Sequence, residues 1–284
     1  MPDEDLQDER ERMLDNWEAA AKGWGRQADR MQATARPISE WMIANAGLAP
    51  GQRVLELAAG PGDTGFMAAR LIEPGGTLIC SDATAGMLDV ARERAEAQGI
   101  ANVEFKQLQL EWIDLPAASV DVILCRWGVM LTVDPAAALR ECRRVLKPGG
   151  RLALAVWDVR EENPWVTIPD GALIALGHSQ SPPPGSPGMF ALSAPGRLTE
   201  LLEETGFYEI DVEEVPIIWR WGSVLDWIGE TRDRSHNFST VWAGLSDDER
   251  QRLRVRVAAD AEPYKDETGA FELPGSALAA AASA

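Results

Sequence analysis

The chain has 284 residues, of which 45% are hydrophobic, so it can bury a sizeable core as one large domain or as one domain with an inserted cap. It carries 27 Lys and Arg residues against 45 Asp and Glu residues, a formal net charge of −18. Such a surface repels phosphate backbones and anionic membranes, which excludes nucleic acid as an expected partner and disfavours RNA as a substrate.

The three cysteines, Cys80, Cys125 and Cys142, form no even disulfide framework. We expect them to be buried thiols of a protein in a reducing cytoplasm, and we expect no metal site. The N-terminal sequence MPDEDLQDERER is acidic, whereas a secretory signal begins basic and then becomes apolar. No apolar run approaches the roughly 20 residues of a membrane span. These features together predict a cytoplasmic protein.

Two helices are predicted within residues 1–49, separated at Pro37. The sequence GLAPGQ then ends this unit. We expect the unit to be a helical cap over the pocket of its own chain or of a neighbouring copy. The second arrangement would require a homodimer. The apolar residues at helical spacing are Leu14, Trp17, Ala21 and Trp24 before the proline, and Ile38, Trp41, Met42 and Ala46 after it.

From Arg53 onward, short apolar runs alternate with amphipathic segments, which is typical of a parallel α/β sheet. The pair Asp134-Pro135 predicts the start of a helix, and KPGG predicts the turn from that helix into the fifth strand. The predicted strands are RVLEL (53–57), TLICS (77–81), VEFKQ (103–107), VDVILC (120–125) and RLALAVW (151–157).

This alternation stops after Trp157, where SQSPPPGSP is too rich in Pro, Ser and Gly to pack regularly and predicts a lid or surface loop. We expect residues 50–284 to form one domain with cap insertions at about 158–194 and 222–262. The elements predicted beyond residue 194 are a helix over 195–205 closed by Gly206, a strand over 208–221, a helix after Ser223, a helix opened by the capping box of Ser246 and Glu249, and a last strand within 269–284.

The stretch VLELAAGPGDTG combines a strand, a glycine turn and a helix, and Gly60, Gly62 and Gly65 match the G-x-G-x-x-G pattern of dinucleotide-binding folds. Ligands of open α/β sheets bind at this edge. The pyrophosphate of NAD would meet Glu56 and Asp63 there, and each like-charge pair at about 4 Å costs from about 1 kcal/mol in water to several at an effective dielectric constant of 20. S-adenosylmethionine carries no phosphate. The loop therefore favours S-adenosylmethionine over NAD.

The second strand ends in CSDATAGMLDVA, where Asp82 can accept hydrogen bonds from both ribose hydroxyls of either cofactor. A plain surface aspartate is the alternative. Thr84 can cap the following helix. Met87 either contacts the adenine or packs in the core. Asp82 thus predicts a ribose site without deciding the cofactor.

Five motifs, in order over roughly residues 50–160, resemble class I S-adenosylmethionine-dependent methyltransferases of the small-molecule branch that includes the ubiquinone and menaquinone biosynthesis enzymes. The resemblance implies a Rossmann-like, seven-stranded, mostly parallel sheet with helices on both faces and an antiparallel last strand. The motifs are VLELAAGPGDTG, the D-x-T-x-x-M-L-x-x-A run from Asp82, LEWIDLP from Leu110, VDVILCRWG from Val120 and RVLKPGGRL from Arg144.

The resemblance also implies S-adenosylmethionine as methyl donor and S-adenosylhomocysteine as product. By the same resemblance, Glu56, Gly60 and Gly62 surround the methionine part, and Arg126 and Trp127 lie under it. The adenine is expected at the Gln109 to Glu111 turn. Two positions depart from the family pattern: Ala58 replaces its first glycine, and Gln109 replaces an acid. The implied cofactor-binding residues are Glu56, Ala58, Gly60, Gly62, Asp82, Ala83, Met87, Gln109, Leu110, Glu111, Arg126 and Trp127.

Methyl transfer depends on aligning and enclosing the two reactants more than on a protein nucleophile. Holding two groups in alignment lowers the activation barrier by roughly 7–11 kcal/mol. A base is required only if the acceptor is a hydroxyl or an acidic carbon. The candidate bases are His178 and His236, although a solvated or structural histidine is the commoner outcome. Asp158 and Glu161 follow the fifth strand, where an acceptor would approach.

Eleven tryptophans are unevenly distributed and gather in the segments that would surround an acceptor. Packing is the commoner role of any single one, but together they indicate a flat apolar or aromatic acceptor, methylated at oxygen or carbon. Two other functions stay open: an S-adenosylmethionine-binding regulator without catalysis, and an NAD-dependent oxidoreductase, for which no Tyr-x-x-x-Lys pair is present. The predicted acceptor-binding residues are Trp24, Trp127, Trp157, Trp219 and Trp221.

Overall fold

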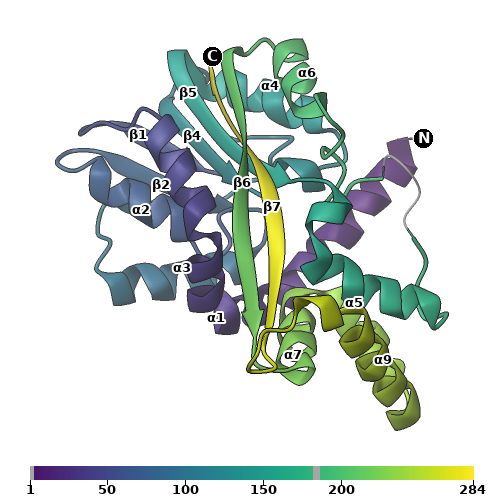
Figure 1. Ribbon diagram of the computed structural model, residues 1–284. Helices are drawn as coiled ribbons and strands as arrows, with labels where there is room; N and C mark the ends of the chain where they lie inside the picture. The colour runs from purple at the N-terminus through teal and green to yellow at the C-terminus, as the bar shows by residue number, and fades with distance from the viewer. Residues whose placement is uncertain (1–2, 182–185) are drawn as a thin grey trace.

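The structure is a computed structural model that describes residues 3–181 and 186–284. Its centre is a seven-stranded sheet in the order β3-β2-β1-β4-β5-β7-β6 (Figure 1). β7 runs antiparallel to both neighbours, and β1 to β5 pair in parallel, which confirms the predicted sheet. The strands are β1 (Arg53–Glu56), β2 (Thr77–Asp82), β3 (Val103–Gln107), β4 (Val120–Arg126), β5 (Leu146–Trp157), β6 (Tyr208–Trp221) and β7 (Phe271–Ser283).

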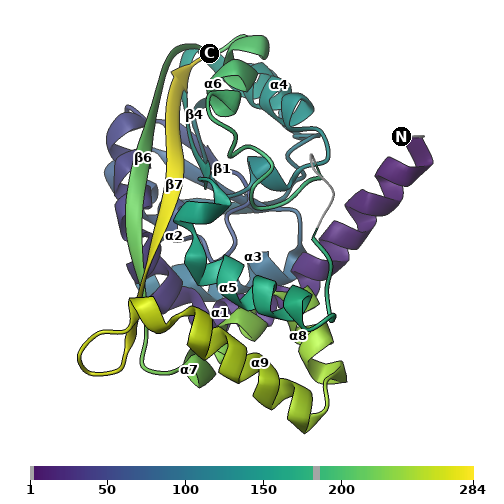
Figure 2. The same ribbon diagram turned by 45° about the vertical axis from the view of Figure 1, so that its right-hand side comes forward.

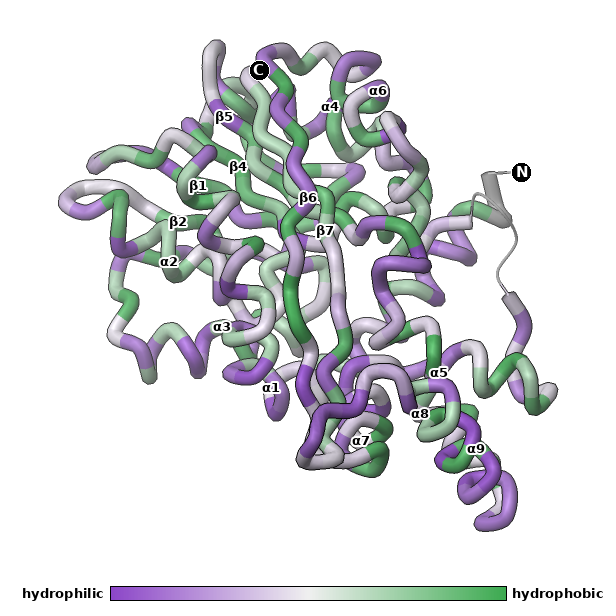
Figure 3. The backbone as a smooth tube through the Cα atoms, viewed as in Figure 1, coloured by the Kyte–Doolittle hydropathy of each residue, from purple (hydrophilic) through white to green (hydrophobic). Residues whose placement is uncertain are grey.

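Helices cover both faces of this sheet. α1 contacts both α2 and α3 on one face, and α4 and α6 contact each other on the opposite face (Figure 2). The central strands β1 and β4 are hydrophobic (Figure 3) and their residues are mostly buried, so the core lies between the sheet and its two helix layers. These helices are α1 (Asp3–Asn45), α2 (Asp63–Leu71), α3 (Ala85–Gln98), α4 (Pro135–Val145) and α6 (Arg197–Glu204).

The prediction of two N-terminal helices was wrong, because α1 is a single helix that continues through Pro37. Proline removes one backbone hydrogen bond and normally breaks or kinks a helix. Here the buried residues Met31, Ala35, Ile38 and Met42 form one stripe that stays in helical register across the proline. Burial of this stripe on both sides of Pro37 offsets the loss of the backbone hydrogen bond.

A long hairpin of β6 and β7 extends past the parallel strands and leads to the helices α7, α8 and α9 (Figure 1). Two helices were not predicted. α5 lies where a lid or loop was expected, and its internal Pro169 obscured the helical pattern, while α8 begins with a cap from Ser235. The bounds are α5 (Pro164–Ala175), α7 (Val224–Arg234), α8 (His236–Gly244) and α9 (Asp247–Asp260), with 3-10 turns at Val129–Leu131, Arg160–Glu162 and Glu262–Tyr264.

Several local predictions are confirmed. Asp134 caps α4 by accepting a 2.9 Å hydrogen bond from the backbone N–H of Ala137, and Ser246 forms the predicted capping box at α9. All three cysteines are buried free thiols. Residues 182–185, within the predicted lid, lie outside the described residues. In the described ranges, no helix has the length and apolar character needed to cross a bilayer.

Candidate functional site

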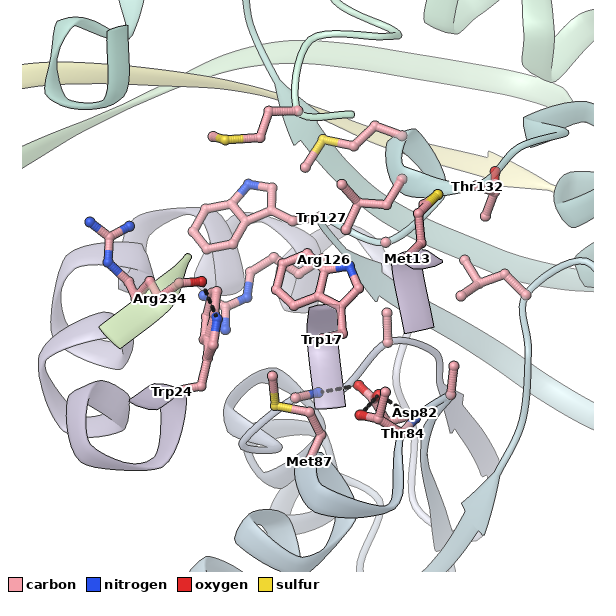
Figure 4. A pocket seen from close by; sticks show the side chains of 18 of the residues that line it. Met13, Trp17, Trp24, Asp82, Thr84, Met87, Arg126, Trp127, Thr132 and Arg234 are labelled. Carbon is pink, nitrogen blue, oxygen red and sulfur yellow. Dashed lines mark hydrogen bonds between the residues drawn. The ribbon is translucent and has the colours of Figure 1, made fainter. Parts of the chain in front are cut away.

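A pocket of about 350 Å³ opens at the carboxyl ends of β1, β2, β4 and β5, the edge at which open α/β sheets bind ligands. The N-terminal half of α1 forms one wall, as Met13, Trp17 and Trp24 show in Figure 4. Another wall comes from α5 and the end of α7. α1 therefore lines the pocket of its own chain. The predicted cofactor residues that line the pocket are Ala58, Gly60, Asp82, Ala83, Met87, Gln109, Leu110, Glu111, Arg126 and Trp127.

Asp82 joins the ends of β1 and β2. Its Oδ2 accepts a 2.9 Å hydrogen bond from the Gly60 N–H, and its Oδ1 accepts from both the N–H and the hydroxyl of Thr84. Thr84 thus binds Asp82 instead of capping α3 as predicted. A carboxylate offers about four lone-pair sites, so one remains, and a second becomes available when the Thr84 hydroxyl rotates away. Asp82 can therefore accept one or two ribose hydroxyls.

Glu56 and Gly62 do not line the pocket, in contrast to their predicted contact with the cofactor. Glu56 is buried and its Oε1 accepts a 2.8 Å hydrogen bond from the Gly65 N–H, which holds the start of α2 against β1. Gly62 has a φ of 85°, and a Cβ there would lie 2.4 Å from the Phe66 ring. Both residues therefore stabilise the glycine loop through contacts with α2, on the side away from the pocket.

Burial raises the pKa of Glu56 to about 8, although the Gly65 N–H and Arg126 favour its charged form. The unfolded chain loses this proton near the ordinary pKa of 4.5, so unfolding releases a proton between pH 4.5 and 8 and stability falls as the pH rises through that range. Glu56→Gln removes this penalty and keeps the acceptor for Gly65. We expect denaturant unfolding at pH 5 and pH 8 to show the variant gaining about 2 kcal/mol or more over the wild type at the higher pH.

Glu104→Gln, which removes an exposed carboxylate from the edge strand β3, serves as the matched control and should not show this gain. A Glu56→Gln variant that is equally destabilised at both pH values would mean that Glu56 is ionised in the folded protein.

The two acids of the glycine loop do not oppose a pyrophosphate as predicted. Burial favours the protonated form of Glu56 by raising its pKa, and Asp63 is buried between Arg94, at 2.8 Å, and Arg126, at 3.5 Å. Two guanidinium groups therefore neutralise the Asp63 carboxylate. The charge argument against NAD fails on this geometry, and the choice of cofactor rests on other observations.

The residues present fit S-adenosylmethionine. Nη1 of the buried Arg126 has no hydrogen-bond partner among residues 3–181 and 186–284, which suits the carboxylate of the methionine part. A Cβ placed on Gly60 would meet nothing within 4 Å, so a ligand can approach this stretch of backbone closely. Ala58 and Trp127 have φ values of 49° and 63°, a left-handed conformation that costs a non-glycine residue roughly 1–2 kcal/mol. Such strain gathers at functional sites.

The predicted adenine end is closed by α1. Met87 and Leu110 are buried and line the pocket, while the Gln109 side chain is exposed at its rim. Glu111 forms an ion pair of 2.9 Å with Arg10 of α1 and accepts a hydrogen bond from the Asp134 N–H. This carboxylate thus fastens α1 to the sheet, a role that the motif did not indicate.

Tryptophans wall the other half of the pocket. Trp127 stacks on Trp157 with ring centroids 4.2 Å apart, and Trp165 lies 4.9 Å beyond Trp157. Trp17 and Trp24 of α1 line the pocket as well (Figure 4). Of the predicted acceptor residues, Trp24, Trp127 and Trp157 thus reach the pocket.

Trp219 and Trp221 do not reach the pocket. They continue the stack behind Trp165: the ring centroids of Trp165 and Trp219 are 4.2 Å apart, and those of Trp219 and Trp221 are 5.6 Å apart. The stack ends at Trp227, which packs on Trp221. Because alternate residues of β6 point to the same face, these two rings are buried between the hairpin and α7. Their prediction as acceptor contacts is corrected: they support Trp165.

None of the predicted bases lines the pocket. His236 is exposed, and His178 lies 3.8 Å from Glu249 of α9. Asp158 is buried and accepts from the Ser276 hydroxyl, and Glu161 is exposed. The pocket instead contains Asp170 of α5, which the sequence did not single out.

Burial raises the pKa of Asp170 to about 6, and Arg160 partly opposes this shift. A carboxylate with such a pKa is a competent base near neutral pH. The sequence signal for Asp170 was its spacing of four from Val166, which also lines the pocket, but this is informative only once α5 is known to be a helix.

A model of the family described as "Methyltransferase domain" matches residues 48–206, which include the strand ends that build the pocket. The chain belongs to this methyltransferase family. S-adenosylmethionine is accordingly its cofactor, as the class I motifs predicted. The solved structures that resemble it confirm the Rossmann-like methyltransferase fold.

The curated relatives include the ubiquinone/menaquinone biosynthesis C-methyltransferases UbiE of Cellvibrio japonicus and Xanthomonas campestris. The first is 40% identical over 111 residues, which are 39% of this chain and 45% of that protein. The second is 36% identical over 117 residues, 41% of this chain and 46% of that protein. The methyltransferase thus matches slightly less than half the length of these relatives.

Several solved structures cover most of the chain, and two of them serve as examples. The YcgJ protein of Bacillus subtilis has a TM-score of 0.57 at 21% identity and covers 87% of this chain and 97% of its own. The structure of a putative methyltransferase with the Trm112 methyltransferase activator of Haloferax volcanii has a TM-score of 0.58 at 18% identity, over 95% of this chain and 96% of its own. At these identities the likeness concerns the fold alone.

Proposed function

We propose that the protein transfers the methyl group of S-adenosylmethionine to a small apolar or aromatic acceptor, at oxygen or carbon. The observation that carries this proposal is one continuous pocket in which cofactor residues at the strand ends meet a wall of tryptophans at Trp127. The relatives' names, which refer to C-methylation in quinone biosynthesis, support a flat acceptor.

The proposed cofactor contacts follow from the fit described above. Asp82 accepts from the ribose, Arg126 holds the methionine carboxylate, and Met87 with Leu110 encloses the adenine. In the same proposal, residues 1–49 and the insertions at about 158–194 and 222–262 act as the cap, since α1, α5 and the end of α7 supply the other walls.

The bound cofactor supplies a methyl group that is already activated by a sulfonium. The chain's own residues then have two tasks. The stacked Trp127 and Trp157 hold a flat acceptor in line with the methyl and exclude water, and an apolar wall is suitable because charge is consumed during the transfer. Asp170 receives the proton that a hydroxyl or acidic carbon acceptor releases.

The proposal is tested by incubating the protein with methyl-labelled S-adenosylmethionine and three acceptor classes: naphthols, aromatic acids and small aliphatic amines. Label in an aromatic product supports the proposal. Turnover confined to the amines contradicts the proposed acceptor class. Tight cofactor binding with no product from any class would favour the alternative of a regulatory protein without catalysis.

Asp82→Ala is expected to weaken S-adenosylhomocysteine binding by roughly 10- to 100-fold, because hydrogen bonds to a charged group contribute about 1.5–3 kcal/mol. Calorimetry with the intact chain measures this loss. Asp89→Ala, an exposed aspartate of α3 paired with Arg92, is the matched control and should bind as the wild type does. Equal affinity in both variants would mean that the ribose lies elsewhere.

A further inference from the structure

A buried cation lies at the end of the pocket opposite Asp82. Arg234, the last residue of α7, lines this end (Figure 4). Its side chain is only 9% exposed, and its Cζ lies 5.0 Å from the ring centroid of Trp165 and 4.8 Å from that of Trp219. The two indole rings hold the guanidinium in place through cation–π contacts.

The negative charge next to Arg234 is shared with a second cation. Oε1 of the buried Glu230 lies 3.3 Å from Arg234 Nε, but its Oε2 lies 2.6 Å from Arg30 Nε and accepts a 2.7 Å hydrogen bond from Trp221 Nε1. Asp233, one residue before Arg234, is already bound by Arg26 and Gln27. Two guanidinium groups thus share one carboxylate, which leaves an excess positive charge at the pocket wall.

The hydrogen-bonding capacity of Arg234 is also unused. Within the described parts of the chain, no hydrogen bond involves its guanidinium, and its Nε is buried without a partner. Burial lowers the pKa of Arg234 to about 10, so the group stays charged at neutral pH. The acids that line the same pocket, Asp82, Glu111 and Asp170, form no ion pair with it among the described residues. Glu230 offsets only part of the cost of burying this charge because it also pairs with Arg30, so a second anion at Arg234 would be stabilising.

We propose that Arg234 binds a carboxylate of the methyl acceptor, which makes the acceptor an aromatic acid. This inference rests on the proposed function and narrows its substrate class. A carboxylate accepts two parallel hydrogen bonds from the planar guanidinium, and the neighbouring face of Trp165 packs against the ring that bears it. Because Arg234 and Asp82 are at opposite ends of the pocket, an acceptor anchored at Arg234 lies on the far side of the cofactor site (Figure 4).

The test compares 2-naphthoate with the neutral 2-naphthamide, each titrated by calorimetry into protein saturated with S-adenosylhomocysteine. We expect the wild type to prefer the carboxylate by roughly tenfold to hundredfold, the range for hydrogen bonds to charged groups. Arg234→Met keeps the length and apolar stem, and it should remove the preference while S-adenosylhomocysteine binding is unchanged. Arg232→Met, an exposed arginine in the same turn of α7, is the control and should keep the preference.

Each outcome has a distinct meaning. A preference that survives in Arg234→Met, or no preference in the wild type, overturns the role of Arg234. Failure of both naphthyl ligands to bind the loaded wild type overturns the acceptor class, and failure of S-adenosylhomocysteine itself to bind overturns the proposed function. Should Arg234→Met not fold, Arg234→Lys carries the test: its single ammonium cannot form the paired bonds, so an undiminished preference would contradict the inference.

Discussion

Replacing Asp170 with Asn is expected to lower turnover of a hydroxyl acceptor by roughly 10²- to 10⁴-fold, the usual contribution of a positioned general base. The carboxylate lines the acceptor half of the pocket, and Asn cannot take up the acceptor's proton. Affinity for S-adenosylhomocysteine should not change, because Asp170 lies on α5 and the cofactor residues lie at the strand ends.

The pH profile separates this role from a structural one. The base must be unprotonated, so kcat/KM of the wild type should rise with pH until the pKa of about 6 and then level off. The Asn variant should lack this inflection. Glu161→Gln, an exposed acid outside the pocket, is the matched control and should retain both rate and profile. Near-normal turnover in the Asn variant would show that the acceptor needs no base.

Replacing Trp157 with Ala is expected to destabilise the protein by about 3–5 kcal/mol and to abolish acceptor binding. Loss of a buried tryptophan leaves a cavity as well as lost apolar contact. Trp157 is 3% exposed and is the central ring between Trp127 and Trp165, so its removal breaks the stack that forms the acceptor wall. Denaturant unfolding measures the first effect, and calorimetry with 2-naphthoate measures the second.

Trp112→Ala is the matched control for this variant. Trp112 is 77% exposed, so its removal should leave both stability and acceptor binding near the wild-type values. Trp157→Phe keeps an aromatic ring in the stack and should retain most acceptor affinity with a smaller loss of stability. Normal acceptor binding in a folded Trp157→Ala variant would contradict the aromatic wall.

The sheet was predictable because its strands are short apolar runs bounded by glycine and proline. The region around β5 illustrates this: Asp134 caps the preceding helix, and KPGG leads into the strand. Local patterns failed where packing between distant segments decides the structure. Pro37 lies inside α1 because a buried stripe on both sides holds the helix together, and α5 tolerates Pro169 within its own sequence.

The residues that line the pocket at the strand ends were predictable, and those on the cap helices were not. The motifs identify residues next to strand ends, so Asp82 and Arg126 follow from chain order alone. Asp170 and Arg234 come from two cap helices more than 60 residues apart, and only the folded chain brings them to one pocket. The sequence also cannot show that the Glu56 carboxyl is buried, which raises its pKa.

The central claim is that one pocket holds the cofactor and a flat acceptor on either side of Trp127. A crystal structure of the protein with S-adenosylhomocysteine and 2-naphthoate tests it most directly. We expect the ribose at Asp82, the methionine carboxylate at Arg126, and the naphthyl ring against Trp157 with its carboxylate at Arg234. A cofactor whose sulfur faces away from the tryptophan wall, or an acceptor bound outside this pocket, would contradict the claim.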